Sequence, residues 1–374
     1  MAELQLNVGS TVALPKPQFD TILARLREKG YQTIGPRIRD EAVVYAPVGS
    51  LADLPQGFTS TEGAAQYRVV PSGNSRYFDI TPGAQSWKQF FFPPRISVMK
   101  ARKNGGWKAE KNSEAAPRIA LIGVRPCEIA AIKVQDLAFL RDDFTDPFYS
   151  DRRKNAFLLA VNCLHPGGTC FCDSMGTGPK ASANFDLALT ELDDAFLLEI
   201  GSEAGKEILK GLPLKSADPS QLGKAEQGLT AAKGKMGRRM DTRDLPDLLL
   251  KNLNHPEWEA VSKRCMSCAS CTLVCPTCFC WDTQDHTSLN GNETERERVW
   301  DSCFNPGYSS VAMGGNNRPN TRSRYRQWLS HKFGTWKEQY GVLGCVGCGR
   351  CITWCPVKID VTEEIAALRK EVRS

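Results

Sequence analysis

The sequence predicts a mixed α+β and α/β protein, with an N-terminal α/β domain followed by a smaller domain organised by cysteines. Two observations support this prediction. Apolar runs of strand length alternate with helical segments in the first part of the chain, as in βαβ units. Eleven of the fifteen cysteines lie between Cys265 and Cys355. We therefore expect a boundary near residue 250, with domains at 1–250 and 251–374, in agreement with about 100–200 residues per domain.

The first element expected is an amphipathic helix over residues 16–28. Its apolar side chains recur at helical spacing, at Phe19, Ile22, Leu23 and Leu26. Gly30 would end the helix. Residues 42–45 and 67–70 are short β-prone segments.

A βαβ unit is the clearest part of the N-terminal domain. Residues 119–124 form an apolar run of strand length, and Arg125 and Pro126 form a turn. Residues 128–140 suit a helix, and 157–161 form a second apolar run. This order favours two parallel strands joined by a helix.

Residues 201–240 are rich in Lys, Gly, Ser and Ala, which predicts a surface excursion. Its basic stretch, residues 233–239, fits either a nucleic-acid contact or a solvated loop, and the loop is the favoured interpretation. Residues 241–252 and 258–264 are predicted helices that lead into the cysteines.

Two cysteine runs of identical spacing dominate the last third of the chain. Each has the form C-x2-C-x2-C-x3-C-P, and they begin at Cys265 and Cys345. Short gaps let one loop place three thiolates around a cubane, and the fourth cysteine of such a run ligates the other cluster in two-cluster ferredoxins. We therefore predict a bacterial-type ferredoxin-like domain with two [4Fe-4S] clusters. The predicted ligands of the first are Cys265, Cys268, Cys271 and Cys355. The predicted ligands of the second are Cys345, Cys348, Cys351 and Cys275.

Zinc is the alternative occupant of these runs, because C-x2-C is also a zinc spacing. Zinc does not explain the third cysteine or the Cys-Pro that closes both runs. Gly347 and Gly349 lack side chains, which would let backbone N–H groups approach the cluster sulfurs.

A long insertion, about residues 277–344, separates the two runs and holds three further cysteines. Cys278, Cys280 and Cys303 could be alternative ligands, redox thiols or groups that face a partner. They could equally be buried small apolar residues beside the clusters.

Four cysteines in the N-terminal domain form a second candidate set. Cys127 and Cys163 follow the two predicted strands, and Cys170 and Cys172 lie in the glycine-rich loop that comes next. Loops at the carboxyl ends of adjacent parallel strands meet at one edge of a sheet. These four thiols could hold a third [4Fe-4S] cluster. A zinc site, a reactive thiol and unligated cysteines remain alternatives, and His165 is a possible extra ligand.

Composition excludes several classes of protein. The net charge of +6 is small for this length and does not indicate nucleic acid. No run of 18 apolar residues and no secretory signal are seen, so a cytoplasmic protein without a membrane span is expected. Nucleotide-binding and hydrolase motifs such as G-x-G-x-x-G and the P-loop are also missing. The pattern predicts an electron carrier with no catalytic site of its own.

The chain resembles the β subunit of cytoplasmic NAD(P)-linked [NiFe]-hydrogenases, the sulfhydrogenases, and the A subunit of anaerobic sulfite reductase. The resemblance rests on GVRPCEIAAI (123–132), NCLHPGGTCFCDSMGTGP (162–179), FDLALTEL (185–192), CTLVCPTCFC (271–280), RSRYRQWLSHKF (322–333) and CVGCGRCITWCPVKID (345–360).

The resemblance implies an iron–sulfur electron-transfer subunit in a hetero-oligomer. Such a subunit links a flavin-containing NAD(P) reductase subunit to the small and large subunits of a [NiFe]-hydrogenase. The alternatives are the A subunit of an anaerobic sulfite or sulfur reductase and a free-standing ferredoxin-like carrier. The resemblance also places the four N-terminal cysteines in a family pattern, which favours the third cluster.

Overall fold

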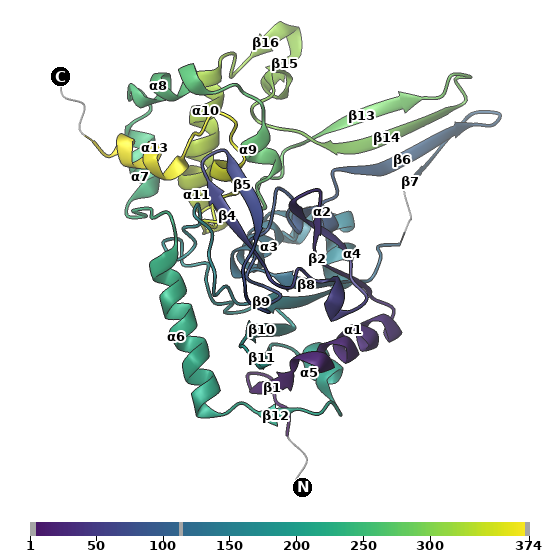
Figure 1. Cartoon of the computed structure of the whole chain (residues 1–374). Helices are drawn as coiled ribbons and strands as arrows, with labels where there is room; N and C mark the ends of the chain where they lie inside the picture. The colour runs from purple at the N-terminus through teal and green to yellow at the C-terminus, as the bar shows by residue number, and fades with distance from the viewer. Residues whose placement is uncertain (1–4, 112–114, 371–374) are drawn as a thin grey trace.

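The fold is described from a computed structural model, which places residues 5–111 and 115–370. A large sheet occupies the lower half of the view in Figure 1, and a mainly helical region lies above it. A long arm of strands extends to one side. The described chain is therefore a mixed α/β protein whose cysteine runs lie in the helical region.

The large sheet has eight strands in the order β12-β1-β11-β10-β9-β8-β2-β3. The four strands β2, β8, β9 and β10 are parallel, and the outer strands pair antiparallel. The bounds are β1 Thr11–Pro15, β2 Gln32–Arg39, β3 Ala42–Pro47, β8 Ile119–Val124, β9 Ala156–Val161, β10 Leu187–Glu191, β11 Ala195–Ile200 and β12 Lys215–Ser216.

Helices cover both faces of this sheet, so its central strands are apolar on both sides. Ala120 and Ile122 of β8 pack in one core, whereas Ile119 and Leu121 pack in the other. This alternation follows from the two-residue period of a strand. The flanking helices are α1 Phe19–Glu28, after the 3₁₀ turn η1 Lys16–Gln18, with α2 Lys88–Phe91, α3 Pro126–Phe139, α4 Pro147–Lys154 and α5 Glu203–Leu209. The predicted amphipathic helix and the βαβ unit are both confirmed.

The helical region has its own apolar core. Trp258, Tyr325, Trp328 and Phe333 are buried together there. Its helices are α7 Leu245–Lys251, α8 Glu257–Arg264, α9 Ser270–Leu273, α10 Thr321–Ser330, the π-helical turn η6 His331–Thr335, α11 Trp336–Tyr340, α12 Arg350–Thr353 and α13 Val361–Leu368. No helix in the described part of the chain is both long and apolar enough to span a membrane.

The arm is a four-stranded antiparallel sheet in the order β13-β14-β6-β7 (Figure 1). Strands from the insertion between the cysteine runs therefore pair with strands from the N-terminal half. The bounds are β6 Arg95–Lys103, β7 Trp107–Lys111, β13 Trp281–Thr287 and β14 Glu293–Trp300. The remaining elements are η2 Leu51–Asp53, β4 Phe58–Gly63, β5 Gln66–Pro71, η3 Asp142–Phe144, η4 Pro306–Ser309, β15 Ser310–Val311, η5 Ala312–Gly314 and β16 Gly315–Asn316.

Residues 201–240 lie largely at the surface, as expected, but they form regular secondary structure. Most of the second half of this segment is helix α6 Pro219–Lys235, which begins with a capping box at Asp218. The stretch 233–239 is mostly exposed, as a solvated segment would be, but it is anchored because Met236 is buried and Arg238 Nε lies 2.5 Å from Asp360 Oδ2. The low hydrophobicity of the segment concealed the buried contacts of Met236 and Arg238 that anchor it.

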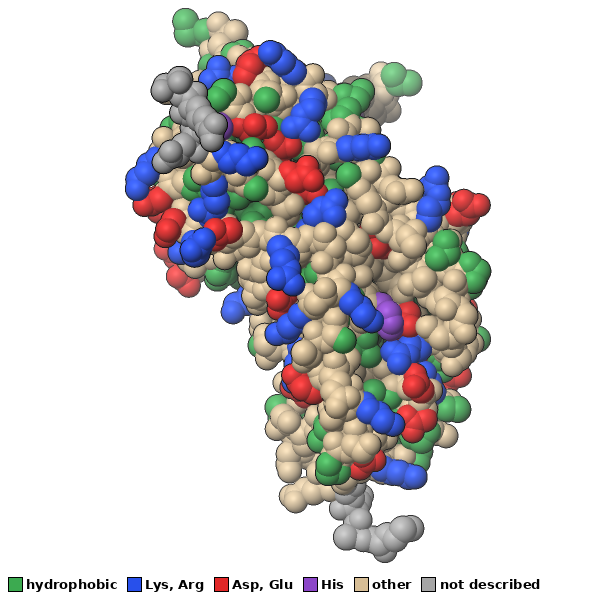
Figure 2. All heavy atoms as spheres, turned by 60° about the vertical axis from the view of Figure 1, so that its left-hand side comes forward, with side chains coloured by type: hydrophobic (Ala, Val, Ile, Leu, Met, Phe, Trp, Pro, Cys, Tyr) green, Lys and Arg blue, Asp and Glu red, His purple; other side chains and the backbone are tan. Residues whose placement is uncertain are grey.

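On the molecular face shown in Figure 2, basic and acidic side chains are interspersed.

Candidate metal centres

The first cysteine cavity gathers one complete predicted ligand set. Cys265, Cys268, Cys271 and Cys355 all line it, together with aromatic side chains such as Tyr325 and Trp328. Three of the cysteines come from the first run and Cys355 comes from the second. The fourth cysteine of the second run therefore lies with the first three cysteines of the first run, as the spacing predicts.

Backbone N–H groups point at the sulfurs of this cavity. Ser267 N donates to Cys265 Sγ at 3.4 Å, and Ile359 N donates to Cys355 Sγ at 3.3 Å. Such N–H···S bonds stabilise thiolate character and help to set the reduction potential of an iron–sulfur cluster.

The second predicted set also lies together. Cys275, Cys345 and Cys348 each interact electrostatically with Cys351, and burial with these neighbours raises the pKa of Cys351 well above its usual range. Gly347 N donates to Cys345 Sγ at 3.4 Å, which matches the bond at Cys265 in the first run. The two runs thus repeat the same local geometry.

The four N-terminal cysteines line a third cavity. Cys127 follows β8 and Cys163 follows β9, so the two adjacent parallel strands deliver both thiols to one edge of the sheet. Cys170 and Cys172 reach the same cavity from the glycine-rich loop. The structure therefore brings together all twelve cysteines of the sequence prediction in three groups.

The third cavity adjoins the second cysteine run directly. Phe171 N donates to Gly347 O at 2.9 Å, and the hydroxyls of Thr169 and Thr353 lie 2.7 Å apart. Cys348, a predicted ligand of the second cluster, lines the third cavity as well. The N-terminal loop and the ferredoxin-like loop thus form one continuous structure.

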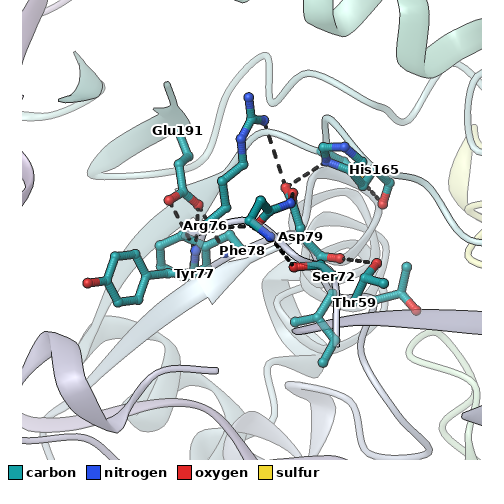
Figure 3. Close-up of polar contacts among 12 residues, drawn as sticks. Thr59, Ser72, Arg76, Tyr77, Phe78, Asp79, His165 and Glu191 are labelled. Atoms are coloured by element: carbon teal, nitrogen blue, oxygen red, sulfur yellow. Dashed lines mark hydrogen bonds and ion pairs between the residues drawn. The ribbon is translucent and has the colours of Figure 1, made fainter. Parts of the chain in front are cut away.

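Non-cysteine residues also form the wall of the third cavity. Glu62 and Arg125 line it. Arg125 Nη2 donates to Phe78 O and Ile80 O at 2.6 and 2.5 Å. The segment that contains Phe78 and Ile80 is held in turn by Glu191, as Figure 3 shows. The Glu191 carboxylate accepts from backbone N–H groups of this segment, including Phe78 N at 2.9 Å. Arg125 is therefore anchored to a segment that is itself hydrogen-bonded to Glu191.

His165 does not line the third cavity. Its Nδ1 lies 2.6 Å from Asp79 Oδ1, as Figure 3 shows, and its backbone carbonyl accepts from Cys163 Sγ at 3.5 Å. The side chain positions the cysteine loop against the 72–81 segment, and the structure gives no support for His165 as a ligand.

A buried ion pair joins the two halves of the molecule between the second and third groups. Arg350 Nη2 lies 2.8 Å from Glu128 Oε1, and the side chains are only 4% and 1% exposed. Tyr45 donates its hydroxyl to Glu128 Oε2 at 2.9 Å, and Arg350 Nε donates to Gly83 O at 3.1 Å. Both charges therefore have several partners, as buried charges require.

Two buried lysines lie beside the second group. Lys332, in the π-helical turn η6, donates to Cys275 Sγ at 3.4 Å and to Thr277 Oγ1 at 3.0 Å. Lys88 Nζ donates to Cys278 O at 3.2 Å and lies 3.9 Å from the centre of the Trp300 ring. Hydrogen bonding from Cys278, aided by Lys332, lowers the pKa of Cys275 well below its usual range. The positive charges of Lys88 and Lys332 favour negative charge at Cys275 Sγ.

The chemistry of the three groups fits iron–sulfur clusters. Burial raises the pKa of Cys127, Cys172 and Cys271, and neighbouring thiols raise each further. Several thiolates can share such a site only if a polycation balances them. The first and third cavities have similar volumes, about 30 and 40 Å³.

A single metal ion fits less well. Within residues 5–111 and 115–370, no three His, Cys, Asp or Glu side chains converge closely enough to hold one ion. Zinc needs four ligands at about 2.0–2.3 Å from one centre. Thiols arranged around a cavity suit the larger body of a cluster.

Sequence reasoning missed several residues of these sites. Three of them are far in sequence from the cysteines that they approach, namely Glu62, Lys88 and Lys332. Arg350 lies next to Cys351 but carries no motif of its own. Lys332 and Arg350 stand in segments on which the family resemblance rests. Sequence reasoning also gave only part of the role of Gly347 and Gly349.

The glycines of the second run are required by the neighbouring loop. Ser267 and Ala269 hold the equivalent positions of the first run with φ of 51° and 64°, so side chains are tolerated there. A Cβ at Gly347 would lie 2.7 Å from Cys172 Cα, and one at Gly349 would collide with Thr169 O.

Gly349→Ala is therefore expected to disrupt the third group selectively. The added methyl displaces the Thr169 loop, and overpacking of this kind costs about 1–3 kcal/mol. Iron analysis with EPR of the reduced protein should show a loss of about four irons per chain. Ala269→Gly is the matched control and should keep its iron. Full iron in Gly349→Ala would contradict the expectation.

Comparisons with known proteins agree with this geometry. Residues 264–359 match the model of the 4Fe-4S dicluster domain family, which covers both cysteine runs and the insertion. The chain is 30% identical to sulfhydrogenase 2 subunit beta of Pyrococcus furiosus over 366 residues, which cover 96% of this chain and 98% of that protein. No solved structure matches the chain. Because the identity extends over nearly the whole of both chains, this protein belongs to the sulfhydrogenase β-subunit family.

Proposed function

We propose that this chain is the iron–sulfur electron-transfer subunit of a cytoplasmic hydrogenase complex. It would link a flavin-containing NAD(P) reductase subunit to the small and large subunits of a [NiFe]-hydrogenase. The observation that carries the proposal is the continuous series of three cysteine groups, in which neighbouring groups share contacts. Cys351 and Cys348 both belong to the second group. Cys351 also lines the first cavity, and Cys348 also lines the third.

Each group would hold one [4Fe-4S] cluster, with Cys265, Cys268, Cys271 and Cys355 at the first, Cys275, Cys345, Cys348 and Cys351 at the second, and Cys127, Cys163, Cys170 and Cys172 at the third. Such clusters supply one-electron transfer. The protein holds the groups in a fixed order through the crossed cysteines and the Arg350–Glu128 ion pair. Aromatic side chains such as Tyr325 and Trp328 also line the first cavity, which restricts water there.

A groove beside the second group is the proposed docking site for a partner subunit. Its volume is about 420 Å³, and it is lined by Cys345, Val346 and residues of α3 and α11. Lys133, Lys180 and Lys337 line it and are exposed, and no acidic residue does so. None of these lysines forms an ion pair with another residue of the described chain. An acidic segment of the partner that carries its own redox group fits this charge.

Metal and sulfide analysis of anaerobically purified protein tests the proposal. About twelve irons per chain, with EPR signals of three interacting clusters after reduction, are expected. About eight irons would remove the third cluster and leave the N-terminal cysteines unligated. Zinc with little iron would overturn electron transfer as the function.

Charge reversal tests the docking groove. The triple variant Lys133→Glu, Lys180→Glu and Lys337→Glu should slow electron exchange with the partner subunit about tenfold or more at low salt, since charge steers association. Its iron content should stay that of the wild type. The control has the same change of charge on exposed lysines elsewhere, Lys29→Glu, Lys108→Glu and Lys224→Glu. Equal rates in the two variants would exclude the groove.

A further inference from the structure

A buried lysine contacts one of the predicted ligand sulfurs of the second cysteine group. Lys332 lies in the π-helical turn η6, between α10 and α11, and is only 4% exposed. Its Nζ donates to Cys275 Sγ at 3.4 Å, and to Thr277 Oγ1 and Gly344 O at 3.0 Å each. An ammonium group has three N–H donors and no acceptor, so three acceptors around one nitrogen fit the charged form of the side chain.

Lys332 is tied at both ends to the second cysteine run. Gly344, the residue before Cys345, donates its N–H to Lys332 O at 2.8 Å, and its carbonyl accepts from Lys332 Nζ. A Cβ at Gly344 would lie 2.5 Å from the Trp336 ring, so this close approach requires glycine. The position of the ammonium is therefore coupled to the loop that presents Cys345.

No carboxylate balances the charge of Lys332. In the part of the chain that the structure describes, Lys332 forms no ion pair with Asp or Glu, and the same holds for Lys88, which is also 4% exposed. A buried cation needs an anion close to it. The group that Lys332 contacts and that can carry negative charge is the sulfur of Cys275, a predicted cluster ligand.

The matching sulfur of the first group accepts from a neutral donor. Cys355 ends the second run as Cys275 ends the first, and its Sγ accepts from the backbone N–H of Ile359 at 3.3 Å. A buried arginine, Arg324, lies near the first group, but its Nη2 donates to Ser267 Oγ at 3.4 Å. Among the described residues, no hydrogen bond joins Arg324 to a cysteine sulfur. The two groups therefore share their cysteine spacing but differ in the charge of this donor.

We propose that Lys332 acts through Cys275 Sγ to raise the reduction potential of the second cluster above that of the first. The inference rests on the proposed function, in which both groups hold [4Fe-4S] clusters. Reduction adds one electron from a neighbouring iron–sulfur group and no proton, and Lys332 keeps its three protons in both states. A fixed positive charge on a ligand sulfur stabilises the added negative charge. A charged donor does so more strongly than the neutral amide of Ile359.

Such an offset decides where an electron rests among the groups. Cys351 of the second group also lines the first cavity, and Cys348 also lines the third, so the second group lies between the other two. An electron shared between the first and second groups rests at the second, where the ammonium of Lys332 balances its charge.

The test uses the full-length protein with its clusters, purified anaerobically and titrated at controlled potential while EPR follows each cluster. Cys351→Ser identifies the signal of the second cluster, because that variant is expected to lack it. In wild type the second cluster should be reduced before the first. Lys332→Met removes both the charge and the donor. Its second cluster should be at least about tenfold harder to reduce, which is about 59 mV for a one-electron couple.

Lys224→Met is the matched control, because it removes the same charge from an exposed position on α6 and should keep the wild-type potentials. Iron content, measured on the same samples, shows which variants hold their clusters. If Lys332→Met loses iron, Lys332→Gln takes its place, since it lacks the charge but keeps a donor, and its second cluster should also be harder to reduce than that of wild type.

Four results would overturn the role of Lys332 and leave the proposed function intact. They are an unchanged potential in the uncharged Lys332 variants with clusters present, an equal shift in Lys224→Met, reduction of the first cluster before the second in wild type, and loss of iron in both uncharged variants, which would make the lysine structural. Wild-type protein without clusters would overturn the proposed function instead.

Discussion

Cys351→Ser is expected to remove the second cluster and to stop electron transfer through the subunit. Cys351 is the cysteine of the second group that also lines the first cavity, so its thiolate lies where the two groups meet. A serine hydroxyl is a poor substitute for a thiolate ligand of iron. The variant should lose about four irons per chain. Turnover between the two partner subunits should fall to background, as measured by H2-dependent reduction of NAD(P).

Ile352→Val is the matched control for this experiment. Ile352 is the next residue of the same short helix and is fully buried. Its truncation costs only about 0.5–1.5 kcal/mol and changes no ligand. The control should keep its iron and its turnover. Wild-type iron and turnover in Cys351→Ser would refute the ligand assignment.

Arg350→Met is expected to destabilise the protein more than any surface substitution. The change leaves the Glu128 carboxylate buried without its guanidinium partner, and breaking a buried pair in this way costs about 3–5 kcal/mol. The thermal unfolding midpoint of the anaerobic holoprotein should fall accordingly. If the second and third groups hold clusters as proposed, the EPR signature of their interaction should weaken, because the ion pair lies between them.

Two further variants separate charge burial from general damage. Arg239→Met replaces an exposed arginine and should change the unfolding free energy by less than about 0.5 kcal/mol. The double variant Arg350→Met and Glu128→Gln removes the buried charges together and should recover much of the loss. If Arg350→Met unfolds at the wild-type midpoint, the ion pair does not couple the two halves.

Several sequence predictions were local and could be made from periodicity and spacing alone. The helix at Phe19–Glu28 and the strands on either side of α3 depend on neighbouring residues, and the structure confirms them. The contacts that anchor the segment 201–240 could not be predicted, because Met236 and Arg238 are isolated in a polar stretch. Their partners, including Asp360, are distant in sequence. The boundary at residue 250 stays a prediction.

The sequence by itself determined the cysteine groups. Repeated spacing restricts which thiols one loop can present, and the order of strands restricts where Cys127 and Cys163 can lie. Only the tertiary structure decided how the groups adjoin one another. Glycines in the second run, Lys332 and the Arg350–Glu128 pair take their roles from segments that meet by packing. Such contacts leave no periodic signal, because each partner satisfies steric and electrostatic needs that arise only once the chain has folded.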